Sequence, residues 1–106
     1  ANTVPSMVFD EVDVGIGGAV AEVVGRLLRS MAAKSQVLCV THLPQVASQG
    51  HQHLQVAKSA GKDATLASLA QLDAKARVEE IARMLGGIDI TAKTRAAAKE
   101  MLATAE

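Results

Sequence analysis

The chain has 106 residues, of which eleven are basic and eleven acidic, so its formal net charge is zero. This length predicts that residues 1–106 form a single domain with one modest core. Zero net charge argues against a broad nucleic-acid-binding surface, although a local basic patch is compatible with it. Cys39 is the single cysteine, which excludes an intrachain disulfide and favours a cytoplasmic location.

No apolar run reaches the roughly 18 residues of a membrane span, so we expect no membrane partner. The first residues lack the basic and long apolar regions of a signal peptide. Since the sequence has no initiator Met and reaches Phe9 almost at once, we expect a piece of a longer protein, cut just before a strand.

The first forty residues predict a strand, a helix and a second strand. Residues 6–9 form a short apolar run that stops at Asp10-Glu11, and residues 37–40 form another that stops at Thr41-His42. Between them, six apolar residues recur at helical spacing and are expected on one buried face: Val20, Val23, Val24, Leu27, Leu28 and Met31. This order implies parallel pairing of the two strands.

The remaining residues predict a short helix, a β-hairpin and two longer helices. Pro44 fits the first turn of a helix over 45–48. Strand-like alternation over 54–58 and 66–72, with a turn at 60–63, predicts the hairpin. Asp73 and Thr91 are the predicted N-caps of the last two helices, and Gly86-Gly87 ends the first of them. Their apolar positions are expected in the core: Val78, Ile81, Ala82, Leu85, Ala98, Met101, Leu102 and Ala105.

Titratable side chains follow both predicted parallel strands. Because ligands of open α/β sheets bind beyond the carboxyl ends of the strands, Asp10-Glu11 and Thr41-His42 are expected at one functional edge. Four apolar residues followed by Asp-Glu form the pattern called Walker B. The simpler alternative is a strand that ends in an acidic turn, and His42 alone would more often be a capping or packing residue.

In the Walker B interpretation the two carboxylates have different tasks. Asp10 would hold Mg²⁺ through water, because this ion prefers hard oxygen ligands. Glu11 would orient and deprotonate the water that attacks the γ-phosphate of ATP, and His42 would hydrogen-bond a γ-phosphate oxygen.

Four blocks of the sequence resemble the C-terminal end of the RecN family of bacterial DNA repair proteins. They are Phe9–Ile16, Val40–Ala47, Gly50–His53 and Ala82–Gly87. That family resembles the ATPases of the SMC and ABC types. The resemblance implies an α/β fold, the C-terminal half of a P-loop ABC/SMC-type ATPase head. In this half a βαβ unit precedes a β-hairpin and two C-terminal helices.

The resemblance also implies residue roles and partners. Asp10 would be the Walker B magnesium residue, Glu11 the catalytic base and His42 the switch histidine, with Gln45 beside it. Residues 13–17 would form the D-loop, which faces the partner head across a head-to-head dimer and in which Gly17 stands where the family is expected to carry Ser. Asp13 and Gln45 would join Asp10 as cofactor-binding residues. Partners would be the rest of the same head, a second head in a dimer, and DNA during recombinational double-strand-break repair at the bacterial nucleoid.

Two ATPase motifs are absent from the sequence: Gly-x-x-x-x-Gly-Lys-[Ser/Thr] and Ser-Gly-Gly. Without the first there is no cradle for phosphates, so we expect neither ATP nor Mg²⁺ to be bound by this chain alone, and no turnover. Half a head should also expose a sheet edge and a sheet face, which predicts self-association. The alternatives are a non-catalytic interaction module and a head fragment of another SMC- or ABC-type ATPase.

Two weaker patterns, a group of histidines and a basic stretch on the last helix, do not require a functional site. His51 and His53, with Cys39 and His42, match no standard zinc spacing, so a solvated turn is preferred to a metal site. Lys93, Arg95 and Lys99 on the last helix are interpreted as a solvated face in preference to a DNA contact.

Overall fold

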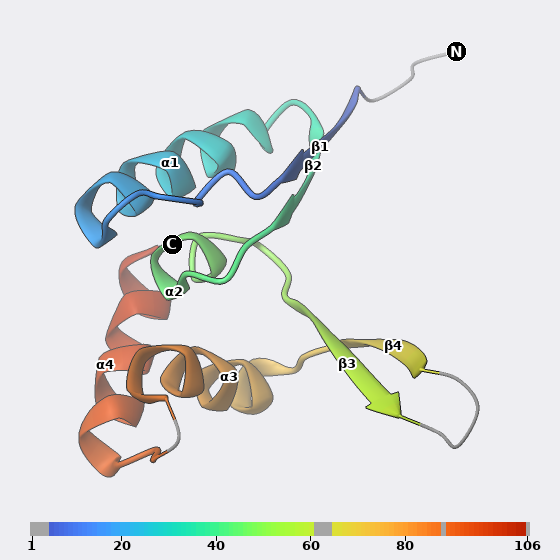
Figure 1. Ribbon diagram of the computed structural model, residues 1–106. Helices are drawn as coiled ribbons and strands as arrows, with labels where there is room; N and C mark the ends of the chain where they lie inside the picture. Colours follow the sequence, from blue (N-terminus) through green and yellow to red (C-terminus); the bar gives the residue numbers. More distant parts are fainter. Residues whose placement is uncertain (1–4, 61–64, 88, 106) are drawn as a thin grey trace.

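The computed structural model describes residues 5–60, 65–87 and 89–105. Its elements are β1 (Ser6–Asp10), α1 (Gly18–Met31), β2 (Gln36–Val40), α2 (Pro44–Ala47), β3 (Leu54–Ala60), β4 (Thr65–Gln71), α3 (Ala74–Gly86) and α4 (Ala92–Thr104). Figure 1 shows β1, α1 and β2 together at the top, α3 and α4 below them, and the β3–β4 hairpin projecting to one side. The mixed α/β class is confirmed. Among the described residues, no helix has both the length and the apolar character needed to cross a bilayer.

The first unit is the predicted βαβ arrangement. Strands β1 and β2 pair in parallel, with Ser6 opposite Gln36 and Asp10 opposite Val40. Successive side chains of a strand point to opposite faces, and here one face is half-buried while the other is exposed. The parallel register brings the carboxyl ends of both strands to the same level.

Helix α1 is buried on a different side from the one expected. Ala21 and Gly25 are buried, whereas Val20, Val23 and Leu27 are more than half exposed, so the predicted burial of those three is wrong. The reason is the position of α2, because a Cβ on Gly25 would lie 2.9 Å from the carbonyl oxygen of Gln45. Helix α2 therefore packs against the small residues of α1. The part of the α1 apolar stripe that contains Val20, Val23 and Leu27 remains uncovered.

The second unit is built around α3 and α4. Ile81, Ala82 and Ala98 are fully buried, and Val78, Met84, Ile90, Met101 and Leu102 pack on them with Ala47 of α2. The predicted caps are confirmed: Asp73 accepts the N–H of Ala76 at 2.7 Å, and Thr91 forms a capping box with Thr94. Gly87 ends α3 with a φ of 72°, a conformation that glycine adopts without strain. Leu85, in the last turn of α3, is 36% exposed, so its predicted burial is not borne out.

Strands β3 and β4 form the predicted antiparallel hairpin, in which Leu54 faces Gln71 and Ala60 faces Thr65. The predicted turn at 60–63 falls largely on residues 61–63, which lie outside the described residues. The hairpin is attached to α3 by a side-chain bond from Gln55 to the buried carboxylate of Glu80, which Arg83 also contacts. A charged group at this depth is stable because both neighbours donate hydrogen bonds to it.

Two arginines join the upper and lower units through the end of α2. Arg29 of α1 donates to the Gln49 carbonyl at 2.6 Å. Arg77 of α3 donates through Nη2 to the carbonyls of Ala47, at 3.1 Å, Ser48, at 3.3 Å, and Gly50. The carbonyls at the end of a helix lack partners within it, so these guanidinium groups satisfy them and fix α2 between both units.

Candidate functional site

The candidate site lies where β1 and β2 end. Because Asp10 is opposite Val40, the residues that follow, Glu11 on one side and Thr41-His42 on the other, lie at the same edge of the sheet. Asp10, Glu11 and His42 are exposed there. The predicted convergence of the two strand ends is confirmed.

Glu11 has an unusual backbone conformation. Its φ is +57°, and it is the one non-glycine residue with positive φ among the described residues. This left-handed conformation costs an L-residue about 1–3 kcal/mol, and such strain is found mostly at functional sites. A turn follows, in which the N–H of Val14 donates to the Glu11 carbonyl at 3.3 Å. The kink at Glu11 turns the chain back toward β2.

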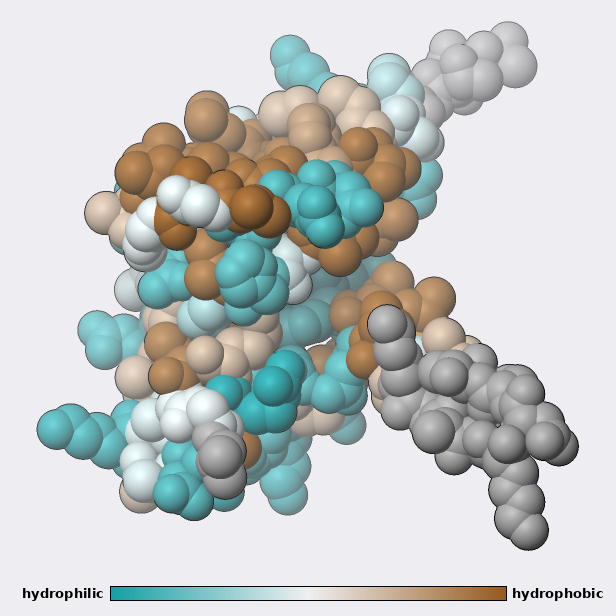
Figure 2. Space-filling view, in the orientation of Figure 1, coloured by the Kyte–Doolittle hydropathy of each residue, from teal (hydrophilic) through white to brown (hydrophobic). Residues whose placement is uncertain are grey.

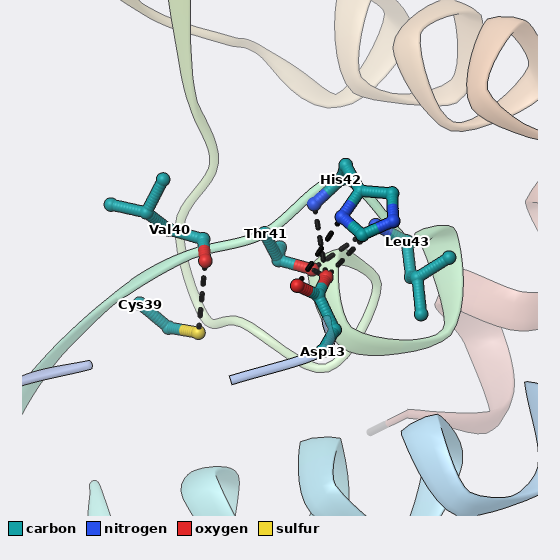
Figure 3. Close-up of polar contacts among 6 residues, drawn as sticks. All are labelled: Asp13, Cys39, Val40, Thr41, His42 and Leu43. Atoms are coloured by element: carbon teal, nitrogen blue, oxygen red, sulfur yellow. Dashed lines mark hydrogen bonds and ion pairs between the residues drawn. The ribbon is translucent and has the colours of Figure 1, made fainter. Parts of the chain in front are cut away.

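Asp13 lies within this turn. Its side chain is 1% exposed, and Oδ2 accepts the hydroxyl of Thr41, the N–H of His42 at 3.0 Å and the N–H of Leu43 at 3.3 Å. Figure 3 shows the carboxylate directed at this loop. A single buried oxygen thus holds the first three residues after β2, and it fixes their position relative to the end of β1.

The Asp13 carboxyl is ionised at neutral pH. Burial alone would raise its pKa, but the hydrogen bonds from Thr41 and His42 outweigh burial and hold the pKa below its ordinary value of 3.8. Its other oxygen, Oδ1, lies 3.3 Å from Nδ1 of the His42 ring. Asp13 therefore holds the backbone of this histidine, and its Oδ1, which accepts no hydrogen bond from the described residues, lies within ion-pair distance of the ring.

The predicted site residues fall into two groups. Asp10, Glu11 and His42 face solvent at the sheet edge, as a site for a bound ligand requires. The Asp13 side chain faces inward and is occupied by the chain's own loop. Gln45, at the start of α2, lies beside the N-terminus of α1, because a Cβ on Gly18 would be 3.1 Å from its Nε2 atom.

Gly17 is the N-cap of α1 and makes no side-chain cap bond. A Cβ added there meets nothing within 4 Å, so the serine expected from the resemblance would fit without strain. The glycine is therefore not required by local packing.

Sequence reasoning missed the structural roles of Thr41 and Arg77. The Thr41 hydroxyl donates to Asp13, and no local sequence pattern indicates that the Asp13 side chain turns inward. Arg77 did carry a signal: it precedes the buried Ile81 by four residues, so the helical period puts it on the core face of α3. A cation at such a position requires a buried acceptor, which the α2 carbonyls provide.

The histidines outside this edge form no metal cluster. Among the described residues, no three His, Cys, Asp or Glu side chains gather closely enough to hold a metal ion. His51 is exposed and His53 is half-buried. Burial, followed by the charge of Arg77, lowers the pKa of His53, with Glu80 opposing this effect.

Comparison with known proteins identifies relatives over almost the whole chain. It is 55% identical over 101 residues to the DNA repair protein RecN of Xylella fastidiosa strain Temecula1 and 54% identical over 101 residues to RecN of Vibrio cholerae. RecN of Bacillus subtilis is 41% identical over 103 residues, or 97% of the chain. The chain is RecN-like. No protein-family model matches it.

The RecN-like chain spans 18% of the length of these relatives. A solved structure from a study titled "Structural biochemistry of ATP-driven dimerization and DNA stimulated activation of SMC ATPases" matches 81% of the chain with a TM-score of 0.62. The match covers 51% of that protein and has 14% sequence identity. The chain therefore has the fold of part of an SMC ATPase, as the sequence blocks implied.

Proposed function

We propose that this chain is the C-terminal lobe of an ATPase head in a longer RecN-like protein of recombinational double-strand-break repair. Residues 1–106 would act there as one domain. The observation that carries the proposal is the common edge of β1 and β2. There Asp10 and Glu11, at the end of β1, and His42, after the end of β2, are all exposed. Similarity to DNA repair proteins over 95% of the chain supports it.

Asp10 suits the role of a magnesium residue. Its carboxylate is exposed at the strand end, where no cluster of three protein ligands forms among the described residues. Mg²⁺ commonly takes one or two carboxylates plus water and phosphate oxygens, and does not require an all-protein cage. In the longer protein, with ATP bound, Asp10 would hold the ion through water, and the ion would neutralise phosphate charge.

Glu11 would act as the general base. Its exposed carboxylate follows Asp10 directly, and the left-handed backbone at Glu11 sets a direction for the side chain that a regular strand would not. There it would accept a proton from the water that attacks the γ-phosphate. His42 would hydrogen-bond the γ-phosphate, held in place by Asp13. Gln45, in the adjoining helix α2, would contribute to cofactor binding.

The exposed apolar surface supports a further partner, the rest of the head. On the outer face of the two-stranded sheet, Val8 is 70% exposed, Leu38 50% and Val40 53%. Figure 2 shows hydrophobic residues gathered over the part of the molecule that contains β1, β2 and α1. Parallel sheets are normally covered on both faces. We propose that other residues of the longer protein cover this face, and that a second head pairs across the segment 13–17.

This uncovered face also leads us to expect self-association of the chain alone. Static light scattering should give a mass that rises with concentration, and Val8→Lys, which puts a charge on the exposed face, should reduce the effect. Lys34→Glu, at an exposed polar position, serves as the charge-changing control. A concentration-independent monomer mass would contradict this expectation.

Turnover of the longer protein tests the function. Replacing a general base usually lowers the rate about 100- to 10,000-fold, so Glu11→Gln should nearly abolish hydrolysis while ATP-dependent pairing of heads persists. If the chain is instead a non-catalytic interaction module, Glu11→Gln will leave ATP turnover unchanged. The chain alone lacks the phosphate-binding motif, and isothermal calorimetry should detect no micromolar ATP binding to it.

A further inference from the structure

A surface hollow lies on the side of the molecule where α1, the segment after α2, and α4 meet. It has two adjoining parts, of about 430 and 320 Å³, which share Arg29, His51 and Ala105 in their linings. The smaller part extends to Arg77 of α3 and Lys99 of α4. Arg29 lies eleven residues after Gly18 at the start of α1, roughly 16 Å along the helix, so the hollow is separate from the edge at Asp10.

The charged residues described as lining this hollow are all basic. They are Arg26, Arg29, Arg77 and Lys99, and none of the described lining residues is Asp or Glu. Arg26 is neutralised by Glu22, at 2.7 Å, and contributes little. The other three have no carboxylate partner among the described residues.

Arg29 and Arg77 are fixed by neutral acceptors. Their hydrogen bonds run to main-chain carbonyls of residues 47–50, and they use one nitrogen of each guanidinium group. These bonds orient the arginines without removing their positive charge. Burial, and then the charge of Arg29, lower the pKa of Arg77, so the two cations repel each other. An anion between them would relieve that repulsion.

We propose that this hollow binds a phosphate group, which Arg29, Arg77 and Lys99 would contact with His51 at the rim. Arginine presents planar pairs of donors that match phosphate oxygens, and lysine adds a mobile charge from a different helix. The volume admits a phosphate with part of an attached sugar. The phosphate could belong to a DNA backbone or to a small free compound. This inference does not depend on the proposed ATPase function.

NMR titration of the chain with inorganic phosphate tests the site. Saturable shifts are expected in the backbone amides of residues 48–51 and 99. Lys99→Gln should weaken the affinity about three- to fivefold, the range of an exposed ion pair. Lys93→Gln, an exposed lysine on the same helix that does not line the hollow, should leave the affinity unchanged. Circular dichroism of both variants verifies the fold.

A second titration, with a short DNA duplex, distinguishes the source of the phosphate. Shifts at the same amides with tighter, salt-dependent affinity would support the site and identify a DNA phosphodiester, because binding to several phosphates releases counterions. Shifts with inorganic phosphate but not with the duplex would support it for a small free compound. Absence of saturable shifts with either ligand, or equal affinity in Lys99→Gln, would overturn the proposal.

Discussion

The carboxylate of Asp13 contacts His42 at two points: Oδ2 accepts its backbone N–H at 3.0 Å, and Oδ1 lies 3.3 Å from ring Nδ1. The third residue after β1 is thereby held to the second residue after β2. A ligand at this edge would meet a His42 backbone whose position relative to the turn after Glu11 is set by Asp13 before the ligand arrives. Such preorganisation reduces the cost of assembling a site.

Removing the Asp13 charge should loosen this edge. Asp13→Asn keeps the shape but weakens a buried acceptor of three bonds, so we expect a loss of about 1–3 kcal/mol in the free energy of unfolding. Chemical denaturation measures it. Asp89→Asn, which changes an exposed carboxyl, should have little effect. Equal stability of the two variants would show that the Asp13 contacts contribute nothing.

Asp13 also predicts a pH dependence of stability. Its folded pKa is lower than the ordinary value of 3.8, so below this value the unfolded chain binds more protons. The stabilisation is fully present above about pH 4 and is lost as the pH falls through the folded pKa. Denaturation in acid should show a smaller loss for Asp13→Asn than for the original chain.

His53 should make the free energy of unfolding depend on pH in a higher range than Asp13 does. Because its pKa in the fold is below 6.5, the unfolded chain binds more protons than the folded chain below that value. Stability is therefore expected to fall as the pH drops from 6.5 through the folded pKa, with Arg77 opposing protonation and Glu80 favouring it. The denaturation midpoint of His53→Gln should therefore depend less on pH than that of the original chain.

The left-handed backbone conformation of Glu11 is expected to lower the free energy of unfolding. Glycine adopts a φ of +57° without strain, so Glu11→Gly should raise the free energy of unfolding by about 1 kcal/mol. Glu11→Gln retains the Cβ and should be no more stable than the original chain. A stability of Glu11→Gly equal to or below that of Glu11→Gln would argue against stored strain at this position.

The close packing of α1 and α2 depends on Gly25. A Cβ there would meet Gln49 Cγ at 2.8 Å and the Gln45 carbonyl oxygen at 2.9 Å, and the second atom belongs to the main chain. Gly25→Ala should therefore destabilise the fold by about 1–3 kcal/mol, despite the helix preference of alanine. Gly18→Ala meets only the end of the Gln45 side chain and is the matched control in thermal unfolding.

Local patterns predicted the elements well because their causes are local. The caps at Asp73 and Thr91, the proline at the start of α2 and the alternation in β3 and β4 depend on neighbouring residues. The exposed stripe of α1 could not be predicted, since its burial depends on what packs against it. The inward turn of Asp13 depends on the left-handed backbone at Glu11 and on a loop 28 residues away in sequence that donates hydrogen bonds to it.

The most direct test of the proposed function is single-turnover ATP cleavage by the longer RecN-like protein carrying Glu11→Gln. Glu22→Gln, on the exposed side of α1, is the control for loss of a carboxylate. We expect the cleavage rate of Glu11→Gln to fall at least about 100-fold, with ATP binding retained and with the control unchanged. Cleavage by Glu11→Gln at the rate of the control would contradict the assignment of Glu11 as the general base.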